Sequence, residues 1–156
     1  MRTRPTNSDD VIDSRDVIEA IEELQGEIEA LTHGDEIASL KAQAERDEAD
    51  EARLADLRAE AAKADPATLA ELQAELDALL KLQDEAEGYC ADWRHGEQLI
   101  RDSYFETYAE ELADDCGMVD RKLAWPYTCI DWERAARELQ YDYTSVEFDG
   151  VTYWTR

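Results

Sequence analysis

The side chains that most often bind metals or act as nucleophiles are few in this chain, and they are widely spaced. Cys90, Cys116 and Cys129 are the three cysteines, and His95 is the histidine nearest to one of them. Structural zinc sites use cysteines or histidines in close pairs, and the sequence has no C-x-x-C pair. Cys90 and His95 could form a nucleophile and its base, but an ordinary small residue near a domain junction explains Cys90 more simply. We predict no metal and no other cofactor.

The carboxylates do not single out a catalytic pair either. Forty acidic residues in 156 bring some Asp and Glu side chains together by chance, so no pair can be assigned as general acid and base. The sequence has no glycine-rich phosphate loop and no G-x-S-x-G. Trp125, Trp132 and Trp154 could stack on bases, although packing in a core explains them more simply. We therefore expect a protein that is not an enzyme.

The net charge limits the possible partners. The chain has a formal net charge of -24, and nucleic acid and anionic membranes repel such a surface. No apolar run reaches the roughly 18 residues of a membrane span, and the N-terminus lacks the apolar stretch of a signal peptide. An odd number of dispersed cysteines suits reduced thiols. These features predict a soluble protein of the cytoplasm.

The composition changes near Gly88, which predicts two regions. Residues 1–88 contain 25 acids, 9 bases and no aromatic residue, whereas residues 89–156 contain 15 acids, 7 bases and all the aromatics. A region without aromatics favours a coiled coil over a compact core. Its first helix has apolar residues at alternating spacings of four and three, which is a short heptad seam: Val17, Ile21, Leu24, Ile28 and Leu31.

Further helices are expected after this seam. "HGDE" at 33–36 interrupts it, with Gly34 ending one helix and Asp35 capping the next. An alanine-rich charged helix covers 37–64, and a third helix begins at Asp65–Pro66 and stops at Gly88. The helices either fold back on each other at Asp65–Pro66 or pair between two chains as a homodimer, because the two kinds of seam look alike.

Residues 89–156 are expected to form a compact module of two helices and a C-terminal β-hairpin. The first helix has one apolar face, closed by Gly117, and consists of Leu99, Ile100, Tyr104, Tyr108, Leu112 and Cys116. Asp131 is the N-cap of the second helix, whose apolar stripe is Trp132, Ala136 and Leu139. The predicted fold is therefore mainly α, with acidic coiled-coil helices at 1–88 and a small α+β module at 89–156.

Asp149–Gly150 predicts a tight hairpin, because both residues tolerate the positive φ of a type I′ turn. A two-residue loop pairs Phe148 with Val151, Glu147 with Thr152, and Val146 with Tyr153. Four of these side chains then share one apolar side of the ribbon, namely Val146, Phe148, Val151 and Tyr153. An isolated hairpin is marginal in water, so we expect that side to pack on the two helices.

The negative charge exceeds the roughly 2 to 8 units that solubility needs in a small domain, and self-repulsion on this scale costs stability. Solvated acidic helix faces are nevertheless common. A functional interpretation is that the carboxylates imitate the phosphates of duplex DNA, which carries about one charge per 1.7 Å of axis.

The segments "SYFETYAEELADDCG", "YTCIDWERAARELQYDY" and "VEFDGVTYW" resemble the C-terminal module of ArdA-type antirestriction proteins and related small proteins of phages and mobile elements. The resemblance covers about residues 103–154. It rests on these positions: Tyr108, Ala109, Glu110, Glu111, Gly117, Ile130, Asp131, Trp132, Glu133, Ala136, Arg137, Glu138 and Leu139. The α/β portions that precede this module in ArdA are absent here.

The resemblance implies an acidic DNA mimic that blocks a bacterial restriction enzyme, a CRISPR effector or another DNA-binding defence protein by binding it. The acids that it carries over to this chain are Glu106, Glu110, Glu111, Asp114, Asp115, Asp131, Glu133 and Glu138. To these we add the run Glu45, Asp47, Glu48, Asp50 and Glu51. The alternative is a coiled-coil assembly or adaptor protein whose acids serve only solubility. Mimicry predicts salt-sensitive binding that DNA competes for, whereas an adaptor with an apolar interface tolerates salt.

Overall fold

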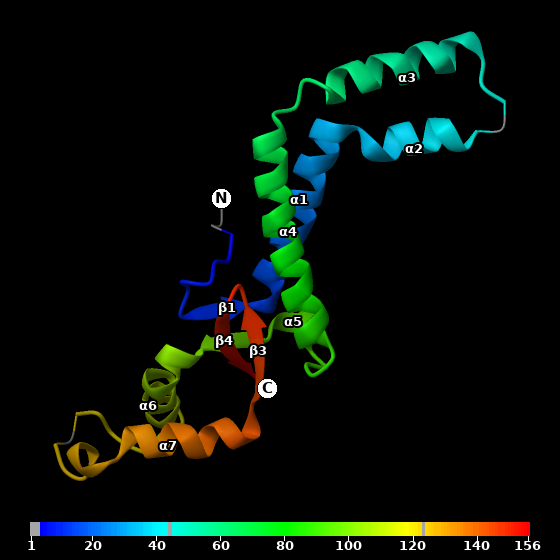
Figure 1. Cartoon of the computed structure of the whole chain (residues 1–156). Coiled ribbons are helices and arrows are strands. Elements are labelled where there is room, and N and C mark those ends of the chain that lie inside the picture. Colours follow the sequence, from blue (N-terminus) through cyan, green and yellow to red (C-terminus); the bar gives the residue numbers. More distant parts are fainter. Residues whose placement is uncertain (1–3, 44, 123) are drawn as a thin grey trace. The chain divides into compact units, whose positions relative to one another are not determined.

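The computed structural model describes residues 4–43, 45–122 and 124–156 (Figure 1). They are mainly helical and include one small antiparallel sheet. The α-helices are α1 (Ser14–Thr32), α2 (Gly34–Ala42), α3 (Glu48–Ala61), α4 (Pro66–Glu87), α5 (Trp93–Gly96), α6 (Phe105–Asp115) and α7 (Trp132–Leu139). Short 3-10 helices cover Asp102–Tyr104, Tyr127–Cys129 and Gln140–Asp142, and the strands are β1 (Val11–Asp13), β2 (Gln98–Arg101), β3 (Thr144–Phe148) and β4 (Val151–Thr155). Within this described part of the chain, no helix combines the length and the apolar character needed to cross a membrane.

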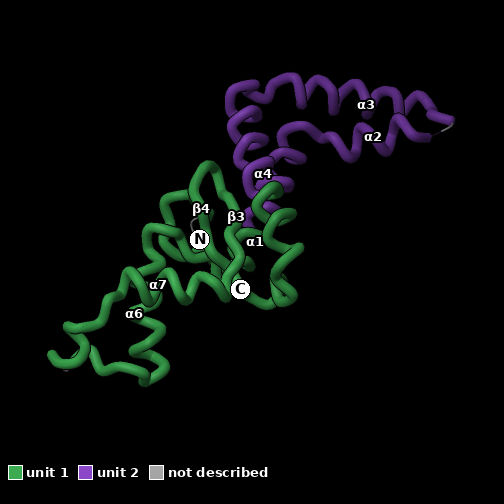
Figure 2. The backbone as a smooth tube through the Cα atoms, turned by 60° about the horizontal axis from the view of Figure 1, so that its bottom comes forward, with its two compact units in different colours: residues 1–18, 80–156 green, residues 19–79 purple. Residues whose placement is uncertain are grey.

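The chain forms two compact units, shown in different colours in Figure 2. The sheet unit consists of residues 1–18 and 80–156, and the helical unit of residues 19–79. The division therefore falls within α1 and α4, whereas the sequence predicts a boundary at Gly88. The reason for the difference is that the N-terminal segment supplies a strand to the sheet.

The sheet has four antiparallel strands in the order β1-β2-β4-β3. β2 lies between β1 and β4, with Ile100 opposite both Val11 and Trp154. The sequence prediction of helix from Leu99 onward is wrong for these residues, since the helix begins only at Phe105. Leu99 and Ile100 are both buried because successive side chains in a strand point to opposite faces, and both faces of this strand are covered.

The C-terminal hairpin has the predicted register. Phe148 pairs with Val151, Glu147 with Thr152, and Val146 with Tyr153. Asp149 and Gly150 have φ values of 46° and 77°, as the type I′ turn requires. The hairpin is not isolated, however, because β4 also pairs with β2.

The two helices of the module pack on the other side of the hairpin from the one that the sequence predicts. A cluster of Ile100, Phe105, Ala109 and Ala136 packs together with half-buried aromatics that include Trp154. Trp154 and Tyr153 are adjacent in β4, so they point to opposite faces. The side of the hairpin that carries Tyr153 is apolar for a different reason than the predicted packing on α6 and α7. That side faces a second layer of the same unit.

This second layer includes the end of α4 and the start of α5, which lie between β1 and β2 in the sequence. Leu82, Ala86, Cys90 and Trp93 are buried. The Cys90 thiol lies 3.1 Å from the Thr155 hydroxyl, which is on the Tyr153 face. The sheet is therefore covered on both faces within one unit.

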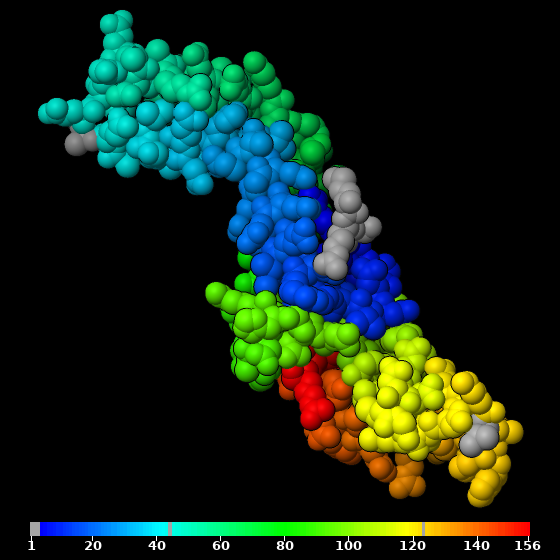
Figure 3. Space-filling model, turned by 180° about the vertical axis from the view of Figure 1, so that it is seen from behind, coloured from blue at the N-terminus to red at the C-terminus, as the bar shows by residue number. Residues whose placement is uncertain are grey.

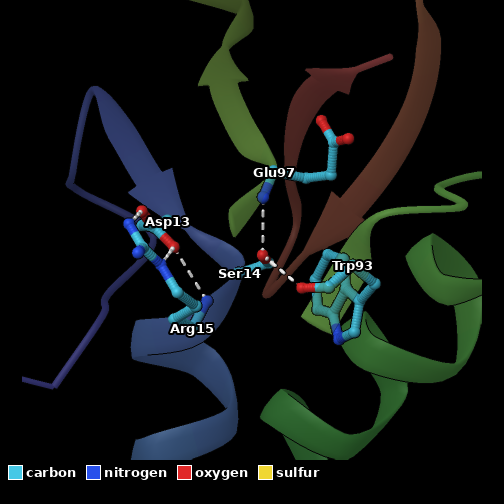
Figure 4. A network of polar contacts seen from close by, with 5 residues as sticks. All are labelled: Asp13, Ser14, Arg15, Trp93 and Glu97. Carbon is cyan, nitrogen blue, oxygen red and sulfur yellow. Dashed lines mark hydrogen bonds and ion pairs between the residues drawn. The ribbon is translucent and has the colours of Figure 1, made fainter. Parts of the chain in front are cut away.

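A buried serine joins the start of α1 to α5 and to Glu97, the residue between α5 and β2 (Figure 4). The Ser14 hydroxyl donates to the carbonyl of Trp93 at 2.6 Å and accepts from the Glu97 amide at 2.7 Å. The Ser14 amide donates to the Glu97 carbonyl at 2.8 Å. Beside it, the Arg15 guanidinium binds the Asp13 carboxylate. These contacts anchor the N-terminal segment in the sheet unit.

The helical unit contains a helical hairpin of α2 and α3, which lie side by side in Figures 1 and 2. Arg53 of α3 forms an ion pair with Glu36 of α2 at 2.9 Å. In this hairpin α2 ends at Ala42 and α3 begins at Glu48, whereas the sequence suggests a fold-back at Asp65–Pro66. Whether chains also pair through these helices stays a prediction.

The junction between α1 and α2 also differs from the prediction. His33, rather than Gly34, has the left-handed backbone, with φ of 50°. Asp35 does not act as the cap, because α2 begins at Gly34 and His33 is its N-cap; the Glu29 carboxylate accepts from the Asp35 amide at 3.0 Å. The Glu29 side chain of α1 thus accepts a hydrogen bond from an amide in the first turn of α2, where amides have no partner within the helix.

The start of α4 is as predicted. Pro66 is its first residue, and the Asp65 carboxylate accepts from the amide and the hydroxyl of Thr68 at 3.0 and 2.8 Å. These hydrogen bonds hold the pKa of Asp65 below its ordinary value. The buried apolar residues of the helical unit come from three helices: Ala20, Ile21, Leu24, Leu54, Leu57, Leu76 and Leu79.

Candidate partner-binding surface

Helix α6 is positioned by aromatic packing. Phe105, its first residue, is 1% exposed and contacts the rings of Tyr108, Tyr143 and Trp154 at centroid distances of 5.5, 5.1 and 6.0 Å. The hydroxyls of Tyr108 and Tyr143 lie 2.9 Å apart. Burial and this hydrogen bond raise the pKa of Tyr108. One face of α6 is therefore fixed, and the opposite face is free to carry charge.

That opposite face is acidic and contains no base. Residues 102–120 contain no Lys, Arg or His, and five of their acids lie in the eleven residues of α6. Glu106 and Asp115 are exposed and have no hydrogen bond or ion pair among the described residues. The end of α6 and the residues after it, yellow in Figure 3, lie at the surface of the face shown there.

Three other carboxylates of α6 have partners. Arg121 forms an ion pair with Glu110 at 3.2 Å, and its amide lies 3.5 Å from the Asp114 carboxylate. The Tyr104 hydroxyl donates to Glu111 at 2.8 Å, which raises the pKa of Tyr104. Arg121 thus offsets one charge of α6, and the tyrosine leaves the charge of Glu111 in place.

The three predicted acids of α7 have structural roles. Asp131 is the N-cap, as the sequence predicts, and accepts from the Arg134 amide at 3.0 Å. Glu138 forms an ion pair with Arg134 at 3.1 Å, and Glu133 with Arg137 at 3.3 Å. Both pairs have i,i+4 spacing, so this neutralisation could have been read from the sequence.

Glu45 and Asp47 of the run at 45–51 precede α3, and Glu48, Asp50 and Glu51 lie in its first turn. Asp47 and Asp50 form a capping box at the start of α3, with the Asp50 amide donating to Asp47 at 2.8 Å. Glu51 forms an ion pair with Arg46 at 2.7 Å. Glu45 and Glu48 are exposed and, in the described ranges, have no such contact. The run lies in the helical unit, whereas the other predicted acids lie in the sheet unit.

The cysteines differ in their surroundings. Cys90 is 3% exposed, and burial raises the pKa of its thiol, so the nucleophilic thiolate is disfavoured. His95 is exposed, and Cys116 and Cys129 are exposed free thiols. In residues 4–43, 45–122 and 124–156, no three or more His, Cys, Asp or Glu side chains are arranged to share a metal ion.

Trp125, Trp132 and Trp154 differ in their contacts and exposure. Trp154 packs in the aromatic cluster and donates to Asp102 at 2.7 Å, and Trp132 contacts the ring of Tyr127 at 5.7 Å. Trp125 is 77% exposed, so the prediction that it packs in a core is wrong. Met118 is also 77% exposed. Nothing in the sequence indicates the exposure of Met118 and Trp125, because neither residue belongs to a periodic element whose buried face could be predicted.

Comparison with known protein families, curated proteins and solved structures gives no match for this chain.

Proposed function

We propose that the protein is a non-catalytic inhibitor that imitates DNA and occupies the DNA-binding site of a bacterial defence enzyme, of the restriction or CRISPR type. The observation that carries the proposal is the charge on α6. Eleven residues hold five carboxylates and no base, on a helix that is fixed by its opposite face. The acids therefore have a defined geometry.

The spacing of these charges supports the proposal. A helix rises about 1.5 Å per residue, so the eleven residues of α6 carry their five carboxylates at an average of about one per 3.3 Å of axis, and Arg121 offsets one of these charges. One strand of duplex DNA carries one charge per about 3.4 Å. A basic groove that accepts a DNA strand meets a similar charge density on α6. The resemblance of residues 103–154 to ArdA-type proteins points to the same function.

The predicted acids do not contribute equally to this function. Glu106 and Asp115 are exposed and have no hydrogen bond or ion pair in the described part of the chain, and Glu111 keeps its charge beside Tyr104, so these three are the strongest candidates for contact. Glu45 and Glu48 are the corresponding candidates in the helical unit, whose 18 acids and 5 bases give a net charge of -13. The acids of α7 contribute less, because arginines offset them.

A second candidate function, a protein adaptor, is favoured by one observation. Met118 and Trp125 are large apolar side chains that are 77% exposed. Met118 lines a pocket with Pro126, the residue after Trp125, and exposed apolar surface of this kind marks protein interaction sites. DNA would not compete with the partner of an adaptor that docks through these two side chains alone.

The two functions are separated by a pull-down from bacterial lysate with the tagged protein. The bound fraction is eluted first with a salt gradient and then, in a parallel sample, with duplex DNA. Mimicry predicts that a DNA-binding protein is released by both eluents. A partner that resists both eluents would contradict mimicry and support the adaptor.

A further inference from the structure

The residues after α6 form an exposed apolar surface that the proposed function does not use. We define this apolar loop surface as Met118, Val119, Trp125, Pro126 and Tyr127. Met118 and Trp125 are each 77% exposed, whereas Val119 and Tyr127 are half-buried. Met118, Val119, Pro126 and Tyr127 line a pocket of about 290 Å³, together with Gly117 and Asp120, and Trp125 directly precedes Pro126 in the chain.

Local hydrogen bonds hold this surface in place. The Met118 amide donates to Ala113 of α6, and the Gly117 amide donates to Asp114, both at 2.9 Å. On the other side, the amides of Cys129 and Ile130 donate to Pro126 and Tyr127 at 2.8 and 3.2 Å. The ring of Tyr127 also contacts Trp132 of α7. Hydrogen bonds therefore hold Met118 to the end of α6 and hold the turn that follows Trp125.

The charge around the surface selects its occupant. The preceding stretch 102–120 has seven acids and no base, and Asp120 lines the pocket itself. Of the two bases that follow, Arg121 is paired with Glu110. A second copy of this chain would bring like charges together, which is unfavourable. A basic partner gains from both the carboxylates and the apolar surface.

We propose that the apolar loop surface docks a basic amphipathic segment of the partner protein, with an apolar side chain of that segment against Met118 and Trp125. The partner's Lys or Arg residues then face Glu106 and Asp115 of α6. This inference rests on the proposed function, because it assigns the α6 carboxylates to the same contact. The carboxylates imitate only the phosphates of DNA. The apolar loop surface would therefore give the inhibitor affinity that imitation of phosphates alone does not provide.

The test uses three synthetic helical peptides as probes: one of Lys and Leu, one with every Leu replaced by Ser, and one with every Lys replaced by Glu. Binding is measured by titration at low and at high salt. We expect the Lys–Leu peptide to bind most tightly and the Glu–Leu peptide not to bind. Trp125→Ala should weaken binding of the Lys–Leu peptide by about tenfold at both salt concentrations, as for a central aromatic contact.

Tyr141→Ala is the matched control, since Tyr141 is 87% exposed in the same unit but lies outside the apolar loop surface. Circular dichroism checks that both variants fold. Equal binding by the two variants, or equal affinity for the Lys–Leu and Lys–Ser peptides, would overturn the docking surface. That result would leave mimicry standing, because mimicry depends on displacement by DNA in the lysate experiment. Conversely, failure of DNA to displace the lysate partner would contradict mimicry without changing the peptide result.

Discussion

Helices α6 and α7 pack against each other, and both are rich in acids, yet they present different surfaces. The five carboxylates of α6 have no base within their own helix. In α7, Glu133 and Glu138 are each one turn away from an arginine that binds them. The count of acids in a helix therefore does not give its surface charge, which depends on the bases that share its faces.

The comparison also separates two tasks that a carboxylate can have. Asp131 caps α7, and Asp47 and Asp50 cap α3, so their oxygens are directed to backbone amides. Glu106 and Asp115 have no such contact in the described part of the chain and remain open to a partner.

The largest effect is expected where α6 is anchored. Phe105→Ala removes a fully buried ring that contacts three aromatic side chains, so the free energy of unfolding should fall by about 3–5 kcal/mol. Urea denaturation followed by circular dichroism measures this change. The exposed Tyr141→Ala should change it by less than about 0.5 kcal/mol. Similar losses in both variants would mean that the cluster does not hold α6.

A second prediction compares the two helices directly. Glu106→Gln with Asp115→Asn should weaken binding to the DNA-binding partner by at least about tenfold, because two open carboxylates are lost. Glu133→Gln with Glu138→Gln removes the same formal charge from α7. This matched variant should change the affinity by less than about twofold, because its carboxylates are already paired. Surface plasmon resonance at fixed salt measures both, and equal losses would refute the distinction between the helices.

A third prediction concerns the capping carboxylate. Asp131→Ala should lower the free energy of unfolding by about 1 kcal/mol, and Asp131→Ser should restore most of it, since serine also caps helices. Thermal and urea unfolding give the comparison. Asp131→Ser should bind the partner as the unaltered protein does. Weaker binding by this variant would show that Asp131 contacts the partner directly.

Features decided by neighbouring residues could be predicted from the sequence. The hairpin register follows from Asp149–Gly150, and the starts of α4 and α7 follow from Asp65 and Asp131. Each depends on a turn or a cap whose hydrogen bonds span a few residues. The sequence contains both partners of such contacts within one short window.

Features decided by distant residues could not be predicted in this way. Leu99 and Ile100 fit a helical face with Tyr104, but pairing with Val11 and Trp154 makes them a strand. The prediction of which face of the hairpin packs against α6 and α7 was wrong for the same reason. In the candidate site, the acids of α6 were evident, whereas the pairing of Glu110 with Arg121 spans eleven residues and depends on the fold of the loop.

The smallest predicted effect on stability gives the sharpest test of the comparison. Arg134→Gln with Arg137→Gln breaks two exposed i,i+4 pairs and should cost about 0.3–0.5 kcal/mol for each. The same change leaves Glu133 and Glu138 unpaired, so α7 becomes a negative surface like α6. Attraction to a basic groove should then rise, and we expect binding about two- to threefold tighter at low salt, with the gain lost at high salt. Weaker binding would instead mean that the arginines themselves contact the partner, and that α7 belongs to the interface through its positive charges.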